Sequence, residues 1–187
     1  YNLATRFWEI GVWFSDAGAL PRADVARSWG EGSWMWSLHM LSGSVPYQTA
    51  LFGVAAACAL LLGAGLFTRA TTIASWALLL SLHNRAPALV TGGDVLLLML
   101  LFWGMFLPWG QRASVDAWRR GHPSGQEPVL SVATAAVLIQ VAFMYFFTGL
   151  SKCNDLWFAG QALESVFHNP LFARPLGAWF AQFPRIL

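Results

Sequence analysis

The chain has 187 residues, of which 57% are hydrophobic and 11% are charged. Soluble domains carry about 25% charged residues, so this composition indicates an integral membrane protein and excludes an ordinary water-soluble domain. The formal net charge of +2 comes without a cluster of lysine and arginine side chains, which excludes an electrostatic surface for nucleic acid. Eleven tryptophans support a membrane location, because tryptophan concentrates at membrane–water interfaces.

The first apolar segment, residues 3–15, is interrupted by Arg6 and Glu9. These two side chains are three positions apart, so on a helix they share one face and can pair. We therefore predict the end of a first membrane helix whose charged face turns into the protein. Residues 16–46 follow as a loop with an aromatic, amphiphilic middle, which is typical of a segment at the membrane interface.

Three apolar runs come next. Residues 47–66 form a span rich in alanine and glycine, which permits close helix packing. Residues 71–83 and Val95–Leu107 are each about 13 residues long, where a full span takes about 20. They become adequate spans only if the polar residues between them lie below the headgroups. A polar pocket that dips into the membrane from one side would accommodate this arrangement.

The longest uncharged run covers residues 129–150. As a helix it is roughly 33 Å long, enough to cross the hydrocarbon core. Another apolar segment begins at Leu171 and runs to the end of the chain. We predict one all-α domain over residues 1–187, a polytopic integral membrane bundle of five to six transmembrane helices that extends beyond both ends of this sequence.

Charges in the loops decide the predicted orientation. When the loops are assigned to alternating sides of the membrane, the two sides have equal numbers of lysine and arginine residues. Arg85 and Lys152 are expected in the pocket, so they are left out of the count. Positive loop charge then marks residues 109–128 as the cytoplasmic side. We expect the protein in a bacterial inner membrane.

The alternation of spans brings a set of polar residues to the opposite membrane face. It comprises His83, Asn84, Arg85, Asp94, Lys152, Asp155 and Trp157. Tyr145 lies three positions before Thr148, and Thr148 lies four positions before Lys152. On a helix these three residues therefore form a polar stripe that extends this set. Such a stripe must face a partner helix, a cavity or the headgroups, because lipid tails cannot satisfy it.

Lys152, the single lysine of the chain, is the candidate catalytic base, and His83 and Asp94 are candidate catalytic partners. A lysine acts as a base near neutral pH only where burial or a neighbouring cation lowers its pKa from about 10.4. Arg85 could lower it, and Asp94 or Asp155 would oppose that effect. The alternative is that Lys152 only reaches to the interface and anchors its helix.

The other site residues also have structural alternatives. Asp94 follows Thr91-Gly-Gly at the start of an apolar run, so it could cap that helix. Arg85 could pair with Asp94 or bind a lipid phosphate, His83 could be a hydrogen-bonded structural residue, and Trp157 could be an interface anchor. The four histidines are scattered, so we predict no metal site, although His83 or His39 could ligate a haem or chlorophyll.

Several short motifs occur in a fixed order along the chain. They are Leu82-His83-Asn84-Arg85, Gly-Gly-Asp94, Phe-Leu-Pro108, Ser114-Val-Asp116, and then Gln140, Tyr145, Gly149, Lys152 and Trp157-Phe-Ala-Gly160-Gln-Ala162. Together they resemble the horizontally transferred transmembrane (HTTM) domain, the family that includes the membrane part of vitamin K-dependent γ-carboxylase. The resemblance runs from about residue 3 to the end.

The resemblance implies a base and a cofactor. In the carboxylase, a lysine at the position matched by Lys152 is held to deprotonate a vitamin K hydroquinone. This chain has Ser151 where the carboxylase has a second lysine, and it lacks the large lumenal domain that captures the substrate protein. The resemblance therefore implies a quinone or lipid cavity more directly than it implies glutamate carboxylation.

Two functions follow as hypotheses. The first is a membrane protein with a polar pocket for a quinone-like or lipid ligand, with carboxylase-related chemistry and Lys152 as base. The second is a non-catalytic subunit of a larger membrane complex, such as a photosynthetic or respiratory assembly, that binds lipid or pigment. In both, membrane lipids are partners.

Overall fold

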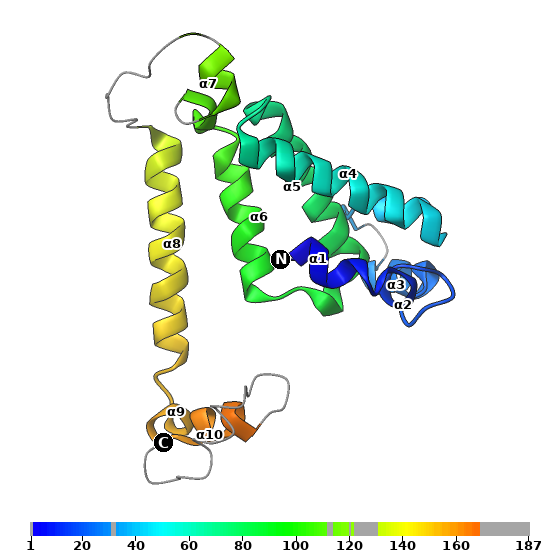
Figure 1. Ribbon diagram of the computed structural model, residues 1–187. Helices are drawn as coiled ribbons and strands as arrows, with labels where there is room; N and C mark the ends of the chain where they lie inside the picture. Colours follow the sequence, from blue (N-terminus) through cyan, green and yellow to red (C-terminus); the bar gives the residue numbers. More distant parts are fainter. Residues whose placement is uncertain (1, 31–32, 112–113, 120, 122–130, 169–187) are drawn as a thin grey trace. The chain divides into compact units, whose positions relative to one another are not determined.

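The computed structural model describes residues 2–30, 33–111, 114–119, 121 and 131–168. Every regular element in these residues is an α-helix or a short 3-10 helix, as Figure 1 shows. The predicted all-α class is therefore confirmed for the described part of the chain. The chain divides into two units, Tyr1–Val137 and Leu138–Leu187, and each is described here by itself.

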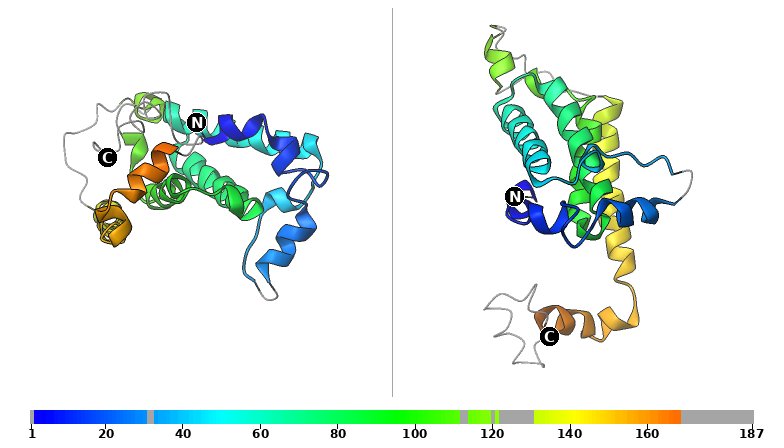
Figure 2. Two further views of the ribbon diagram at one scale, coloured as in Figure 1. Left: turned by 90° about the horizontal axis from the view of Figure 1, so that it is seen from below. Right: turned by 90° about the vertical axis from the view of Figure 1, so that its right-hand side faces the viewer.

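Three helices form the body of the first unit: α4 (Val45–Ala64), α5 (Thr68–Arg85) and α6 (Gly92–Gly104). Helix α5 packs against both α4 and α6, and the views in Figure 2 show the same neighbours. The predicted span at 47–66 corresponds to α4. The two predicted short runs belong to α5 and α6, and α5 is longer than its apolar run because it includes polar residues at both ends.

The N-terminal segment does not form one helix. It forms α1 (Asn2–Phe7) and α2 (Ile10–Trp13), which a turn at Trp8 and Glu9 separates. The predicted pairing of Arg6 with Glu9 is wrong, because Arg6 pairs with a residue of α6 and Glu9 accepts a hydrogen bond from Trp13 Nε1 at 2.8 Å. Arg6 does turn into the protein, whereas Glu9 is exposed.

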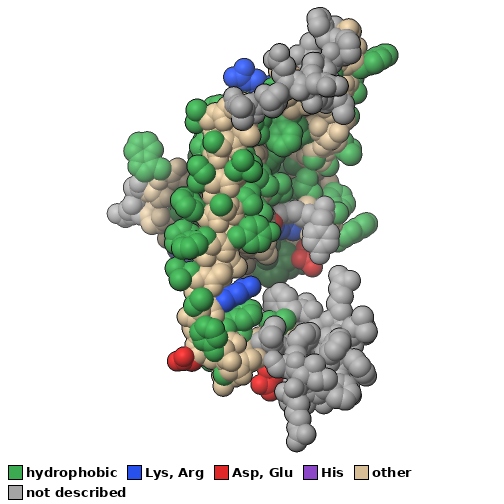
Figure 3. All heavy atoms as spheres, turned by 90° about the vertical axis from the view of Figure 1, so that its left-hand side faces the viewer, with side chains coloured by type: hydrophobic (Ala, Val, Ile, Leu, Met, Phe, Trp, Pro, Cys, Tyr) green, Lys and Arg blue, Asp and Glu red, His purple; other side chains and the backbone are tan. Residues whose placement is uncertain are grey.

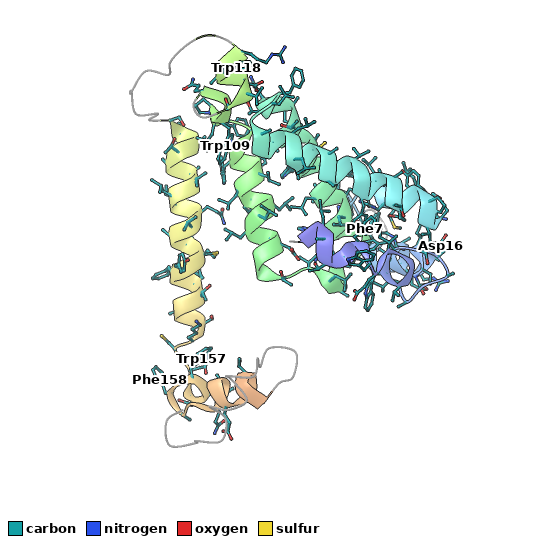
Figure 4. All side chains as sticks on the ribbon, in the orientation of Figure 1. Phe7, Asp16, Trp109, Trp118, Trp157 and Phe158 are labelled. Carbon is teal, nitrogen blue, oxygen red and sulfur yellow. The ribbon has the colours of Figure 1, made fainter. Side chains whose placement is uncertain are left out.

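The predicted interfacial loop at 16–46 contains α3 (Arg22–Trp29) and the 3-10 helix η1 (Leu38–Met40). Arg22 holds its two ends together, since its guanidinium binds the Asp16 carboxylate at 2.7 Å and donates to the carbonyls of Met40 and Leu41 at 3.0 Å. The hydrogen bonds from Arg22 lower the pKa of Asp16 below its usual value. Asp16 follows α2 and is labelled in Figure 4.

The core of this unit lies where α2, α4, α5 and α6 meet. Its buried hydrophobic residues are Ile10, Phe14, Phe52, Leu79, Leu82, Ala86 and Leu98. Phe14 is 0% exposed and stacks edge-to-face on Phe52, with ring centroids 5.2 Å apart. The N-terminal helices are thus part of the core and not a detached tail.

The turn between α4 and α5 is held by a later segment. Gly65 has a φ of 71°, a left-handed conformation that glycine adopts without a steric penalty. Asp116, in α7 (Val115–Arg119), accepts hydrogen bonds from the backbone N–H groups of Phe67 and Thr68 at 3.0 and 2.9 Å. Asp116 therefore caps the start of α5 from a distant part of the sequence. Between α6 and α7 lies η3 (Trp109–Gln111).

The boundary between the units falls inside α8 (Val132–Ser151), the helix predicted from the uncharged run. Hydrophobic side chains cover the face of α8 that is turned to the viewer in Figure 3. Two short helices follow, α9 (Asp155–Phe158) and α10 (Gln161–His168). The predicted segment that begins at Leu171 lies outside the described residues.

Two described helices, α4 and α8, are long and apolar enough to cross a membrane. Only Gln48 and Phe52 are buried in α4, whereas a core helix of a soluble protein would be mostly buried. Helix α6 is apolar but has 13 residues, and α5 has the length of a span without the apolar composition. A membrane protein is therefore indicated, while the bundle of five or six spans stays a prediction.

Candidate functional site

An ion pair joins the N-terminal segment to the start of α6. Arg6 Nη2 lies 2.7 Å from Asp94 Oδ2, and the two side chains are 12% and 9% exposed. The same nitrogen donates to the carbonyl of Leu89 at 2.6 Å. Arg6 therefore fixes both the carboxylate and the chain that leads into α6, which includes η2 (Pro87–Leu89).

Asp94 also caps its own helix. Its carboxylate accepts a hydrogen bond from Thr91 N at 2.9 Å, and Thr91 Oγ1 accepts one from Asp94 N at 3.4 Å. This reciprocal pattern is a capping box. The predicted capping role of Asp94 is confirmed, and the pairing of Asp94 with Arg85 is wrong because the partner is Arg6. The carboxylate thus has a structural role before any chemical one.

His83 belongs to the same group. It is 7% exposed and lies within electrostatic reach of Asp94 and Arg6. Its Nε2 is buried without a hydrogen-bond partner among the described residues. An unpaired buried polar atom is costly, so this nitrogen is available for a partner from outside the chain.

Asn84 and Arg85 face other neighbours. Asn84 Nδ2 donates to the carbonyl of Trp36 at 2.8 Å. Arg85 is fully buried, and its Nη2 donates to the carbonyls of Phe14 and Leu20 at 3.0 and 2.7 Å. Successive residues of a helix point about 100° apart, so three neighbours cannot share one direction. Asn84 and Arg85 thus hold Trp36, Phe14 and Leu20 against α5.

Arg85 Nε and Nη1 have no acceptor among the described residues. A buried guanidinium normally pairs with a carboxylate, a carbonyl or a ligand oxygen. The nearest charges that act on Arg85 are Asp16 and Arg22, which already bind each other. The C-terminal end of α5 therefore carries two residues, His83 and Arg85, with unused hydrogen-bonding atoms.

A cavity and a cleft are lined mainly by residues of α4, α5 and α6. The cavity has a volume of about 100 Å³ and is lined by Leu3, Leu82 and Leu97, among others. Along the sequence, Leu3 lies one turn before Arg6 and Leu97 lies one turn after Asp94. Leu82 directly precedes His83. The cleft measures about 590 Å³ and shares Ala59, Ser75, Leu97 and Leu101 with the cavity. The two spaces thus have four lining residues in common, and most residues that line the cavity are apolar.

The remaining candidate residues belong to the second unit, which includes the C-terminal part of α8. Lys152 Nζ lies over the ring of Trp157, 4.9 Å from the ring centroid. This cation–π contact explains the spacing of the two residues, because Asn154 turns the chain between them and caps α9 by accepting a hydrogen bond from Trp157 N at 3.1 Å. Trp157 is labelled in Figure 4.

Tyr145, Thr148, Lys152 and Asp155 are all exposed in the second unit. Lys152 and Trp157 are the pair that the structure brings together there. His83 and Asp94 form the other group, in the first unit. The predicted convergence of Lys152 on His83 and Asp94 stays a prediction.

The partners of two buried polar residues in the first unit were not predicted from the sequence. Arg6 was expected to pair locally, and His39 was expected only as a pigment ligand. His39 is 2% exposed and its Nδ1 lies 2.7 Å from Gln48 Oε1. In the sequence, each of these residues is a charged or polar side chain within an apolar or aromatic run. This pattern indicates that the side chain needs a partner, but it does not identify the partner.

The described geometry can be compared with known proteins. The family model of the HTTM domain matches residues 23–186, which is most of the chain. No curated protein and no solved structure matches the chain. Helices α1 and α2, including Arg6, come before the matched residues. The match confirms the resemblance seen in the ordered motifs, and the chain belongs to the HTTM domain family.

Proposed function

We propose that this protein is a multi-pass membrane protein that binds a quinone-like or lipid ligand. The ligand's polar group would bind at Arg6, His83 and Asp94, and its apolar part would lie in the cleft between α4, α5 and α6. The observation that carries this proposal is an apolar cavity with three lining residues, Leu3, Leu82 and Leu97, that lie within one turn along the sequence from Arg6, His83 and Asp94. Ligand sites combine apolar walls with a few polar groups in this way.

The size of the space supports a ligand of moderate length. A cleft of about 590 Å³ lies within the range of roughly 300–1,000 Å³ that is usual for small-molecule sites. His83 Nε2 offers an unused hydrogen-bonding atom at the polar end. A neutral polar headgroup could bind there without bringing an unpaired charge into the protein.

A test starts from the protein purified out of native membranes. Mass spectrometry of the extracted complex should identify a stoichiometric quinone or lipid in the wild type. Arg6→Met and Asp94→Asn should lower its occupancy, because each change removes one partner of the ion pair that shapes the polar end. Asp24→Asn, which alters the exposed Arg27–Asp24 pair, is the matched control and should leave occupancy unchanged. Equal occupancy in all four proteins would contradict the proposal.

Within this function we propose Lys152 as the base, as the resemblance implies. Lys152 would remove a proton from a ligand hydroxyl, and His83 and Asp94 would position the ligand. The other proposed residues of the binding pocket are Asn84, Arg85, Tyr145, Thr148, Asp155 and Trp157. Lys152→Arg keeps the charge and the contact with Trp157 but stays protonated, so it should abolish turnover while accumulation in the membrane stays normal. Wild-type turnover and partner retention in Lys152→Arg would remove Lys152 from the mechanism.

The second candidate is a non-catalytic subunit of a larger membrane complex. The observation that favours it is the set of large hydrophobic side chains exposed on α4 and α8, such as Leu60 at 75%, Val132 at 86% and Leu138 at 66%. Lipid or a protein partner would cover them. Purification in a mild detergent distinguishes the candidates, because a subunit travels with stoichiometric partners and a self-contained binding protein travels alone.

We also propose the membrane arrangement that this function needs. The chain would cross a bacterial inner membrane five or six times as a single domain over residues 1–187, with residues 109–128 on the cytoplasmic side. The interfacial loop at 16–46 supports this arrangement, because Trp34 is 98% exposed there and Met35 50%.

A further inference from the structure

Gln48 fixes the hydrogen-bonding state of the buried His39. The Nε2 atom of Gln48 lies 2.8 Å from the carbonyl oxygen of His39 and 2.5 Å from that of Ser42. Carbonyl oxygens only accept, so this atom must be the amide nitrogen, with both of its hydrogens used. The amide oxygen then faces His39 Nδ1 at 2.7 Å and can only accept. His39 Nδ1 therefore carries a proton and donates it to Gln48.

The other ring nitrogen of His39 is left as an acceptor. Burial lowers the pKa of His39 below its usual value, so the ring is neutral and Nε2 holds a lone pair. No hydrogen bond to Nε2 occurs among the described residues. The ring is held in place by Phe14 and Phe52, whose centroids lie 6.1 and 5.8 Å from that of His39. A rigid acceptor of this kind costs little to order when a donor binds.

His39 lines the apolar cavity of about 100 Å³, together with a second unused polar group. Ser75 Oγ is buried and has no hydrogen-bond partner among the described residues. Ser75 lines both this cavity and the larger cleft. The other residues that line the cavity are apolar. An acceptor and a hydroxyl thus stand in a space whose walls offer no other polar contact.

We propose that His39 Nε2 accepts a hydrogen bond from the uncharged hydroxyl group of an alcohol or phenol whose apolar body occupies the cavity and the cleft. A hydroxyl suits this atom because it can donate to the lone pair of Nε2. Ser75 Oγ would be a further polar contact along the ligand, since the two residues line the same cavity. An ammonium or carboxylate is excluded because an unpaired charge cannot enter such walls. An ordered water is a poorer occupant, since buried waters usually make about three hydrogen bonds.

This inference rests on the proposed ligand binding in the cleft and adds a hydroxyl group of the ligand at His39, separate from the polar group proposed at Arg6, His83 and Asp94. His39 is a positioning residue here, because no reacting atom is assigned to it. The cavity of about 100 Å³ is smaller than an engineered cavity of about 150 Å³ that binds benzene in another protein, so a ring at the cavity end would extend toward the cleft. The body of the ligand would then continue past Ser75 into the cleft.

The test uses the full chain in lipid nanodiscs with three probes that share the pentylphenyl body and differ at one ring position: 4-pentylphenol, 4-pentylanisole and pentylbenzene. We expect the wild type to bind the phenol about tenfold more tightly than the anisole, as one hydrogen bond to a preformed acceptor gives. His39→Asn keeps a side-chain N–H for Gln48 and has no acceptor at the position of His39 Nε2, because the shorter side chain ends before it. This variant should bind phenol and anisole alike. Ser75→Ala should reduce the preference in part. Thr49→Ala removes a hydroxyl that bonds to the Val45 carbonyl, outside the cavity, and should keep the full preference.

Each result is decisive. If the wild type binds the phenol and the anisole equally, the hydroxyl site is overturned and ligand binding in the cleft stands. If none of the probes binds, the proposed function of the cleft fails as well. If His39→Asn does not fold, the ¹⁵N shift of His39 Nε2 in the wild type decides instead. That shift should change with the phenol and not with the anisole, and an unchanged shift with the phenol overturns the inference.

Discussion

Arg6 and Asp94 form the ion pair on which the candidate site is built. Both side chains are largely buried, and Arg6 also binds the carbonyl of Leu89. Removing one partner leaves the other charge buried and unpaired. Arg6→Met should therefore lower the free energy of unfolding by about 3 kcal/mol. Arg27→Ala is the control, because its pair with Asp24 is exposed and exposed pairs contribute about 0.5 kcal/mol or less.

This comparison can be measured by unfolding in mixed detergent micelles. A loss in Arg6→Met no larger than that in Arg27→Ala would show that the ion pair does not hold α1 against α6. The double variant Arg6→Met with Asp94→Asn should recover part of the loss, because it leaves no unpaired charge.

His39 gives the first unit a pH dependence. Burial lowers the pKa of His39, so the unfolded chain binds a proton at higher pH than the folded one. The stability that His39 contributes is fully present above the unfolded pKa of about 6.5. It is lost as the pH falls from there toward the lowered pKa of the folded state.

We therefore expect acidification from about pH 7.5 to 5.5 to destabilise the wild type more than His39→Asn, since the variant has no ring to protonate. Parallel unfolding curves at both pH values measure the difference. The same pH slope in the two proteins would mean that His39 is not buried in its neutral form.

The start of α5 depends on the segment at 114–116. A Cβ atom placed on Gly65 would lie 2.3 Å from Ser114 Cβ, and the φ of 71° there is strained for other residues. Gly65→Ala should push this segment away and deprive α5 of its Asp116 cap, at a cost of about 1–3 kcal/mol. Gly53→Ala, in the middle of α4 with open space around the new methyl, should be neutral or slightly stabilising.

Asp116→Ala tests the same contact from the other side. It should cost about 1–2 kcal/mol, because the first turn of α5 loses two hydrogen bonds to a carboxylate. Combining Asp116→Ala with Gly65→Ala should give less than the sum of the two losses, since both remove one contact. Additive losses would show that the two residues act separately.

The proposed topology makes a prediction for the first unit. If α6 crosses the membrane, η2 before it and α7 after it face opposite sides. Ala88→Cys should react with an impermeant maleimide from outside and Trp118→Cys only after the cytoplasmic side is opened, in a background with Cys58 and Cys153 replaced by serine. Reaction of both from the same side would rule out α6 as a span.

The sequence by itself determined the two longest apolar helices and indicated the membrane as their medium. Residues 47–66 and 129–150 contain no charge, and their length and hydrophobicity indicate helices able to span a membrane. The Thr91-Gly-Gly-Asp94 start was enough to predict a cap, because a capping box involves residues within one turn. The ordered motifs were enough to identify the family.

Only the tertiary structure decided which polar residues meet. Arg6 and Asp94 are 88 positions apart, and Thr68 and Asp116 are 48 apart. Local spacing instead favoured Glu9 as the partner of Arg6, and the break between α1 and α2 overturned that expectation. The hydrogen-bonding state of His39 likewise depends on Gln48 and on two carbonyl oxygens beside it. The physical reason is that periodicity encodes which face of a helix is buried, whereas the partner of a buried polar group depends on which helices pack together.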